Sequence, residues 1–172
     1  MSKKHPNKKD IKARVSKELR EGRTRRQILL ELEKEYYDRD HLVKLVVGVP
    51  HPDVKEKYRI YNNVLGILVI ALLIFRCLFF RIDYAGSGLS FLALLMGISV
   101  FNFEAIAYRL TGIILIVTFF RYLFSFDFTN LLVIDFVVTA IVAALSFFLG
   151  LKLFPTYGVL GPKKNGGVFV MD

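Results

Sequence analysis

The stretch VLGILVIALLIF, residues 64–75, decides the fold of this chain. It is the most hydrophobic part of an apolar run from Ile60 to Phe80. A helix of about 20 residues crosses the roughly 30 Å hydrocarbon core of a bilayer, so this run is long enough to span a membrane. Three more apolar runs follow, separated by short polar connections. The sequence therefore predicts an all-α integral membrane protein with a four-helix transmembrane bundle.

The four apolar runs set the expected domain boundaries. The bundle should cover residues 60–154, with spans at approximately 61–80, 87–103, 105–124 and 131–154. Before it lies a basic cytoplasmic helical segment, residues 1–59, and after it a cytoplasmic tail, residues 155–172. Four such runs leave too little polar surface to cover them in a soluble protein, which favours the membrane interpretation.

Charge is concentrated before the first span. Residues 1–60 hold 17 of the 24 Lys and Arg residues and 10 of the 15 Asp and Glu residues. The first 26 residues contain no apolar run, so we expect no cleavable signal peptide.

Basic residues also flank the bundle at both ends. Lys55, Lys57 and Arg59 precede the first span, and the last span ends with Lys152, Lys163 and Lys164. The positive-inside rule then places both termini in the cytoplasm of a multi-pass protein, in the plasma membrane or a bacterial inner membrane. Lys55, Lys57 and Arg59 are also expected to attract anionic lipid headgroups.

The basic segment has its own helix signals. Thr24 and Gln27 fit a capping box, after a short charged helix that ends at Gly22. Asp38 and Asp40 can cap a second amphipathic helix, and a helix that starts near Pro52 is expected to continue without a break into the first span. An apolar stripe in the capped helix could pack against the next helix, lie on the membrane, or bind a partner. It consists of Ile28, Leu29, Leu32 and Tyr36.

A short motif occurs twice in the bundle. FRCLF at residues 75–79 and FRYLF at 120–124 lie 45 residues apart, and each ends a span. The repetition predicts two helical hairpins of the same orientation, related by a pseudo-two-fold axis along the membrane normal.

Charged residues in the predicted spans gather toward the outer face. The cluster consists of Arg76, Arg81, Arg121 and Asp135. An isolated ionised Asp in hydrocarbon costs a few kcal/mol, so Asp135 should pair, become protonated or face water. We expect a structural pair with Arg121 or Arg76. Arginine side chains that reach the headgroups, or an ion path through Asp135, are the alternatives.

No catalytic, cofactor or metal site is predicted. The single Cys77 excludes an internal disulfide, and His5, His41 and His51 are scattered over the basic segment. Motifs of hydrolases, phosphate-binding loops and metalloproteases are missing. The segment around Arg25 faintly resembles the first helix of a helix-turn-helix, but the apolar helix after it lacks base-reading side chains, so nucleic-acid binding is not expected.

Two classes of function remain from the sequence. The first is a non-enzymatic interaction or scaffold protein that recruits a partner through its cytoplasmic head, by the stripe of Ile28, Leu29, Leu32 and Tyr36, or forms homo-oligomers. The alternative is an oligomeric channel or transporter subunit in which Asp135 and nearby arginines line a path.

Overall fold

The computed structural model describes residues 7–79, 84–125, 130–158, 161–166 and 168–171. These residues form eight helices and two short strands, so the all-helical prediction is confirmed. The chain divides into two compact units. We call residues 1–58 together with 151–172 the head, and residues 59–150 the bundle.

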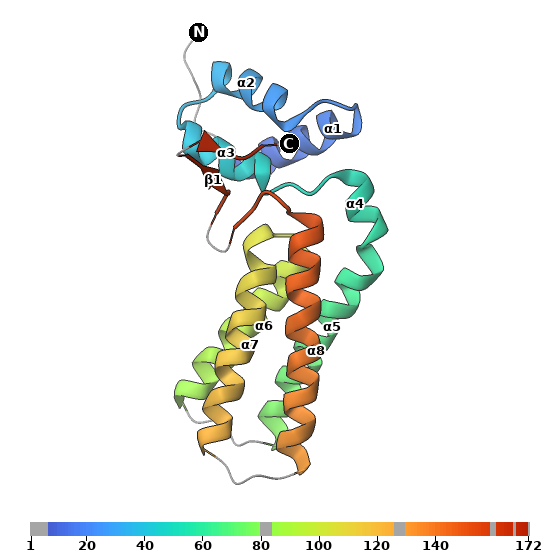
Figure 1. Ribbon diagram of the computed structural model, residues 1–172, viewed down its shortest axis with the longest axis vertical. Coiled ribbons are helices and arrows are strands. Elements are labelled where there is room, and N and C mark those ends of the chain that lie inside the picture. Colours follow the sequence, from blue (N-terminus) through green and yellow to red (C-terminus); the bar gives the residue numbers. More distant parts are fainter. Residues whose placement is uncertain (1–6, 80–83, 126–129, 159–160, 167, 172) are drawn as a thin grey trace. The chain divides into compact units, whose positions relative to one another are not determined.

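The head contains α1 (Lys8–Arg20), α2 (Arg25–Glu35), α3 (Arg39–Val47) and α4 (Pro52–Lys57) (Figure 1). The predicted capping box is confirmed: Gln27 N–H donates to Thr24 Oγ1, and Thr24 N–H donates to Gln27 Oε1. Asp38 caps α3 by accepting from His41 N–H at 3.1 Å. Gly22 follows α1 with φ +84°, a left-handed conformation that glycine adopts without strain.

The core of the head is apolar and its surface is charged. The buried apolar side chains of α1, α2 and α3 include Ile11, Val15, Leu19, Ile28, Leu32, Leu42, Val43 and Val46, and Val49 and Phe154 are buried as well. On the surface, Arg14 forms ion pairs with Glu18 at 2.7 Å and Glu35 at 2.8 Å, so it joins α1 to α2. Hydrogen bonds to Glu18, which contributes most, and to Glu35 raise the pKa of the Arg14 guanidinium above its ordinary value.

The end of the chain belongs to the head. Two strands, β1 (Lys164–Asn165) and β2 (Val168–Phe169), pair antiparallel, with Lys164 opposite Phe169. Before them, Lys163 N–H donates to Thr156 O at 2.9 Å. The tail expected at residues 155–172 is therefore part of the same compact unit as the first four helices.

The bundle consists of α5 (Arg59–Phe79), α6 (Tyr84–Phe101), α7 (Ala105–Ser125) and α8 (Asn130–Leu153), and α8 ends in the head unit. Successive helices run in opposite directions (Figure 1). The turn between α6 and α7 is tight: Phe103 has φ +53°, and Glu104 N–H donates to Ser99 O at 3.1 Å. This hydrogen bond satisfies a carbonyl that the helix end leaves open.

Glycines allow the bundle helices to approach closely. A Cβ at Gly66 of α5 would meet the ring of Phe101 on α6, and one at Gly97 of α6 would lie 2.9 Å from Val69 Cγ1 on α5. The other pair of helices repeats the device, since a Cβ at Gly112 of α7 would lie 2.8 Å from the Phe147 ring of α8. Small residues at helix contacts are typical of helices that pack in lipid.

One predicted feature of the chain is wrong. The helix that begins at Pro52 does not continue into the first apolar run, because α4 ends at Lys57 and α5 begins at Arg59. Tyr58 leaves the helical conformation, with φ −101° and ψ 8°. No glycine or proline marks this break, which is why the sequence did not reveal it.

Candidate functional site

A buried ion pair joins α5 to α8. Arg76 Nε donates to Asp135 Oδ1 at 2.8 Å, and Arg76 Nη2 donates to Asp135 Oδ2 at 2.9 Å. The same Nη2 donates to Thr139 Oγ1 at 2.6 Å. Both charged side chains are 0% exposed. Bidentate contacts between a guanidinium and a carboxylate are strong and specific, because two charge-assisted hydrogen bonds form in parallel.

Helical spacing explains why these residues meet. On α5 the buried side of the helix repeats at three- and four-residue intervals: Asn62, Leu65, Gly66, Val69, Leu72, Leu73 and Arg76. On α8 the same pattern is formed by Leu132, Asp135, Thr139, Val142, Ala143, Ser146 and Leu149. Residues so spaced share one face of a helix, so Arg76 and Asp135 both point inward.

The other two arginines of the predicted charge cluster lie outside the described side chains. Arg121 lies on α7, and its side chain is not among those described. Arg81 lies outside the described residues. Of the two partners left open by the sequence for Asp135, the structure brings Arg76 to it.

A second polar network, which the sequence interpretation missed, involves all four bundle helices. Tyr108 of α7 donates its hydroxyl to Asn62 Oδ1 at 2.5 Å, and Asn62 Nδ2 donates to Val100 O of α6 at 3.1 Å. Ser146 of α8 donates to Tyr108 O. Asn62 lies on the same helical stripe as Arg76, four turns earlier, and this periodicity was the available signal.

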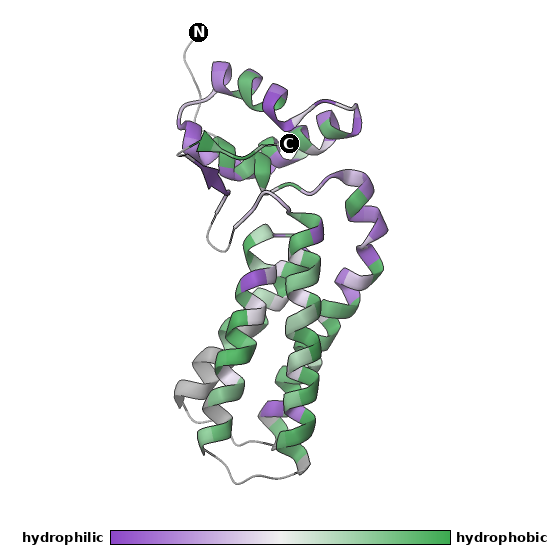
Figure 2. Ribbon diagram, viewed as in Figure 1, coloured by the Kyte–Doolittle hydropathy of each residue, from purple (hydrophilic) through white to green (hydrophobic). Residues whose placement is uncertain are grey.

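The outward-facing side of the bundle is apolar. Each helix carries a large apolar side chain that is more than half exposed: Ile67, Phe91, Val117 and Ile141. In Figure 2 the hydrophobic colour covers most of the described length of α5, α7 and α8. Within the described residues, two helical segments are long and apolar enough to cross a membrane, 59–76 and 131–153, and 105–120 is a shorter apolar segment.

The chemistry available inside the bundle is limited. An apolar groove of about 200 Å³ lies beside Asp135, and its other lining residues include Leu68, Phe75 and Val138. Both carboxylate oxygens of Asp135 already accept from Arg76. Among the described residues, no group of three or more His, Cys, Asp or Glu side chains could hold a metal ion. The arrangement fits a structural link between helices better than a proton or ion relay.

The predicted partner stripe needs a correction. Ile28, Leu29 and Leu32 are at most 3% exposed, because they pack in the core of the head, and Tyr36 is half-buried. The stripe therefore holds α2 against its neighbours and offers no free apolar face. Of the alternatives the sequence left open, packing within the head is the one observed.

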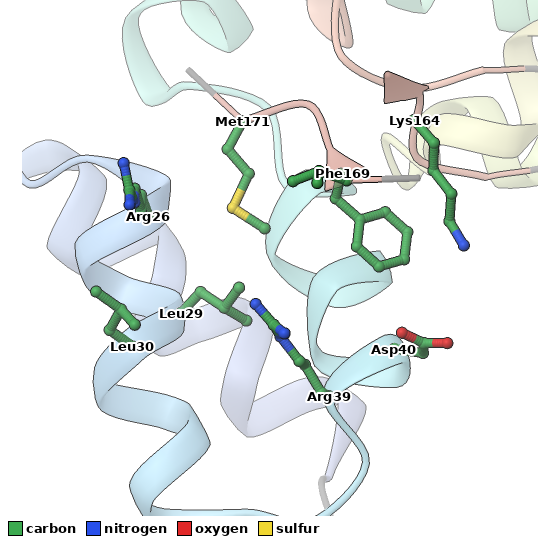
Figure 3. Close-up of a pocket in the computed structure, with 9 residues that line it drawn as sticks. Arg26, Leu29, Leu30, Arg39, Asp40, Lys164, Phe169 and Met171 are labelled. Carbon is green, nitrogen blue, oxygen red and sulfur yellow. The ribbon is translucent and has the colours of Figure 1, made fainter. Parts of the chain in front are cut away.

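The described part of the head has a cleft of about 650 Å³ between α2, α3 and the β1–β2 hairpin, which we call the head cleft (Figure 3). Its polar lining residues are three cations and one carboxylate: Arg26, Arg39, Lys164 and Asp40. Its apolar lining residues are Leu29, Leu30, Val168, Phe169 and Met171. The cleft thus combines apolar contact area with an excess of positive charge.

Comparison of the chain with protein-family models, with curated proteins and with solved structures finds no match.

Proposed function

We propose that this chain is an integral membrane protein in which α5–α8 are four transmembrane helices, and that it recruits a protein partner to the membrane through its cytoplasmic head. It acts by binding and has no catalytic role. The observation that carries the proposal is the polarity of the bundle, in which an ion pair and other polar side chains are buried while large apolar side chains are exposed on the outside.

Inside the bundle, several buried polar side chains hydrogen-bond with one another. Arg76 pairs with Asp135 and Thr139, and Tyr108 pairs with Asn62. Lipid offers no hydrogen-bond partners, so polar groups of a membrane protein face the bundle interior and are paired there.

Outside the bundle, each helix presents large apolar side chains, among them Ile74, Leu95, Ile116 and Ile134. A monomeric soluble protein rarely exposes continuous apolar patches above a few hundred Å². Surrounded by acyl chains, the same side chains need no cover. Polarity of this kind supports a lipid environment for all four helices, including α6 and α7, whose apolar segments are shorter or only partly described.

The charges at the bundle ends support one orientation. Lys55, Lys57 and Arg59 are exposed near the start of α5, and Lys152 is exposed near the end of α8. Basic residues next to spans stay in the cytoplasm, and those near anionic lipid contribute about 1 kcal/mol each. Both termini are then cytoplasmic, in the plasma or inner membrane.

Extraction and labelling test this part of the proposal. The protein should stay in the membrane pellet after an alkaline carbonate wash and dissolve only in detergent. In a Cys77→Ala background, cysteines introduced at the exposed Ala13 and Asn165 should react with an impermeant maleimide only after cells are opened. Release by carbonate, or labelling of either cysteine in intact cells, would contradict the proposed topology.

The sealed ion pair favours an anchor over a channel. A conducting path requires polar groups that exchange partners with ions or water, whereas both Asp135 oxygens are engaged in a fully buried contact. In liposomes the purified protein should give no ion flux above that of empty liposomes. Flux that disappears in Asp135→Ala would instead identify the channel or transporter subunit.

Partner capture tests recruitment. Purification in mild detergent with mass measurement should give one defined stoichiometry of chain and partner. Substitutions on the head surface should abolish capture, while Val137→Ala on the outer face of α8 should leave it intact. If the wild-type protein yields only copies of itself, the recruitment role is wrong.

A further inference from the structure

The head cleft has a definite distribution of charge. Figure 3 shows the end of Arg39 between Leu29 and Phe169, with Arg26 on the α2 side of the cleft and Lys164 on the hairpin side. The three cations come from three different elements, α2, α3 and β1. A ligand that matches this arrangement has an apolar group at its centre and anionic groups on either side.

Arg26 and Arg39 differ in their ion pairs within the head. Arg26 is exposed, and no ion pair formed between described residues includes it. Arg14 and Arg23 of the same unit both pair with glutamates. Arg39 Nε lies 2.8 Å from Glu33 Oε1, and the Arg39 side chain is 72% exposed.

The apolar side of the cleft is also held in place. Lys164 Nζ lies 4.5 Å from the centroid of the Phe169 ring, within the range of a cation–π contact. Lys164 and Phe169 are opposite each other in the β1–β2 pair. The hairpin thus presents one cation and one aromatic ring side by side to the cleft.

The shape and charge of the cleft narrow the class of ligand. A flat bilayer surface cannot enter a cleft, whereas an extended peptide can. Cations spread over three elements can meet several carboxylates of one acidic segment at the same time, as arginine clusters do when they bind acidic motifs. The first residues of this chain, MSKKHP, are basic and lack the required charge.

We infer that the head cleft binds an acidic peptide segment that carries an apolar side chain between its carboxylates. The apolar side chain lies against Phe169 and Met171, and the carboxylates meet Arg26, Arg39 and Lys164. This inference rests on the proposed recruitment function and gives the chemistry of the partner.

A binding measurement with a defined probe tests the inference. The full chain in neutral maltoside micelles is titrated into the fluorescein-labelled peptide DEFED, and anisotropy is recorded. Reversal of both arginines, Arg26→Glu with Arg39→Glu, should weaken binding by about tenfold or more, because charge-assisted contacts become repulsive. Lys164→Glu is an independent variant on the hairpin with the same expected direction. Lys9→Glu is the matched control, an exposed residue of α1 outside the cleft, and should change affinity by less than about twofold.

The peptide controls separate the two parts of the recognition. DESED, which lacks the apolar side chain, and NQFQN, which lacks the charges, should each bind more weakly than DEFED, and added salt should weaken DEFED binding. Equal binding of DEFED and DESED, or equal loss in Lys9→Glu and the cleft variants, would overturn the inference. Binding to phosphatidylserine vesicles without binding to DEFED would also overturn it.

Partner capture distinguishes failure of this inference from failure of the proposed function. If cleft variants that no longer bind DEFED still capture the natural partner, the partner does not bind in the cleft, and the recruitment function stands. If wild type captures no partner, recruitment itself is wrong.

Discussion

The head and the bundle both have apolar cores, but they differ in the side chains they expose and in where their ion pairs lie. In the head, Ile11, Ile28 and Leu42 are buried, while Arg14 and Glu35 form ion pairs at the surface. In the bundle, Arg76 and Asp135 are buried, while Ile67 and Val117 face outward. Both units are helical, so helix content does not distinguish them. They differ in their surfaces, because the charged surface of the head suits water and the apolar surface of the bundle suits lipid. Exposed positions in the two units therefore follow different rules.

The largest expected loss of stability follows from breaking the buried ion pair of the bundle. Asp135→Leu leaves the Arg76 guanidinium buried without its carboxylate, and removal of one member of a buried pair costs about 3–5 kcal/mol. Thermal unfolding in detergent, followed by circular dichroism, should show a large loss of stability. The double variant Arg76→Met with Asp135→Leu should recover most of it, because apolar residues of similar volume replace a buried pair at little cost. A single variant as stable as wild type would mean that the pair contributes nothing.

A smaller effect is expected at the second network. Asn62→Leu removes the acceptor of the Tyr108 hydroxyl and the donor to Val100 O, and buried polar groups without partners cost about 1–3 kcal/mol each. Asn63→Leu is the matched control, because Asn63 is the next residue of α5 and is exposed. Stability in detergent should fall for Asn62→Leu only. Equal effects of the two substitutions would show that helix propensity, and not the network, is being measured.

In the head, loss of a helix cap should destabilise one helix locally. Thr24→Ala removes the side chain that caps α2, at a cost of about 1 kcal/mol. Hydrogen exchange measured by mass spectrometry should be faster in the amides of α2 and unchanged in α5–α8. Thr24→Ser keeps the hydroxyl and should exchange like wild type. Faster exchange spread evenly over both units would contradict their description as separate compact units.

The smallest effect concerns a surface ion pair of the head. Glu35→Gln should cost less than about 1 kcal/mol, because exposed pairs contribute little and are screened by salt. The difference from wild type should shrink further in 1 M salt. The effect of Asp135→Leu should stay the same in that salt, because its pair is shielded from solvent. Equal salt dependence of the two variants would remove the contrast between the units.

Local signals in the sequence correctly predicted several helix starts and ends in the head. The capping box at Thr24, the cap at Asp38 and the end of α1 before Gly22 are confirmed, because such features depend only on neighbouring residues. The break at Tyr58 was not predictable, since no breaker residue is present. The repeat of FRxLF stays a prediction. Its equivalent positions differ, as Leu78 is exposed and Leu123 half-buried.

Contacts between helices were harder to predict than the helices. Asp135 required a partner, but two arginines were equally suitable because a linear sequence does not tell which helix faces α8. Asn62 and Tyr108 lie near the ends of apolar runs, where polar residues often meet the headgroups, and so they were overlooked. The head cleft joins residues more than 100 positions apart, Arg26 and Lys164, and only the folded chain brings them to one surface.

The lipid-facing exterior proposed for the bundle can be tested with a nitroxide label in the reconstituted protein. In a Cys77→Ala background, one label replaces Ile141 on the outer face of α8 and another replaces Ala13 on the surface of the head. Collisions with dissolved oxygen and with a water-soluble nickel chelate report whether each label lies in lipid or in water. The account predicts high oxygen and low chelate accessibility at position 141, and the opposite at position 13. Chelate accessibility at position 141 equal to that at position 13 would contradict the membrane bundle.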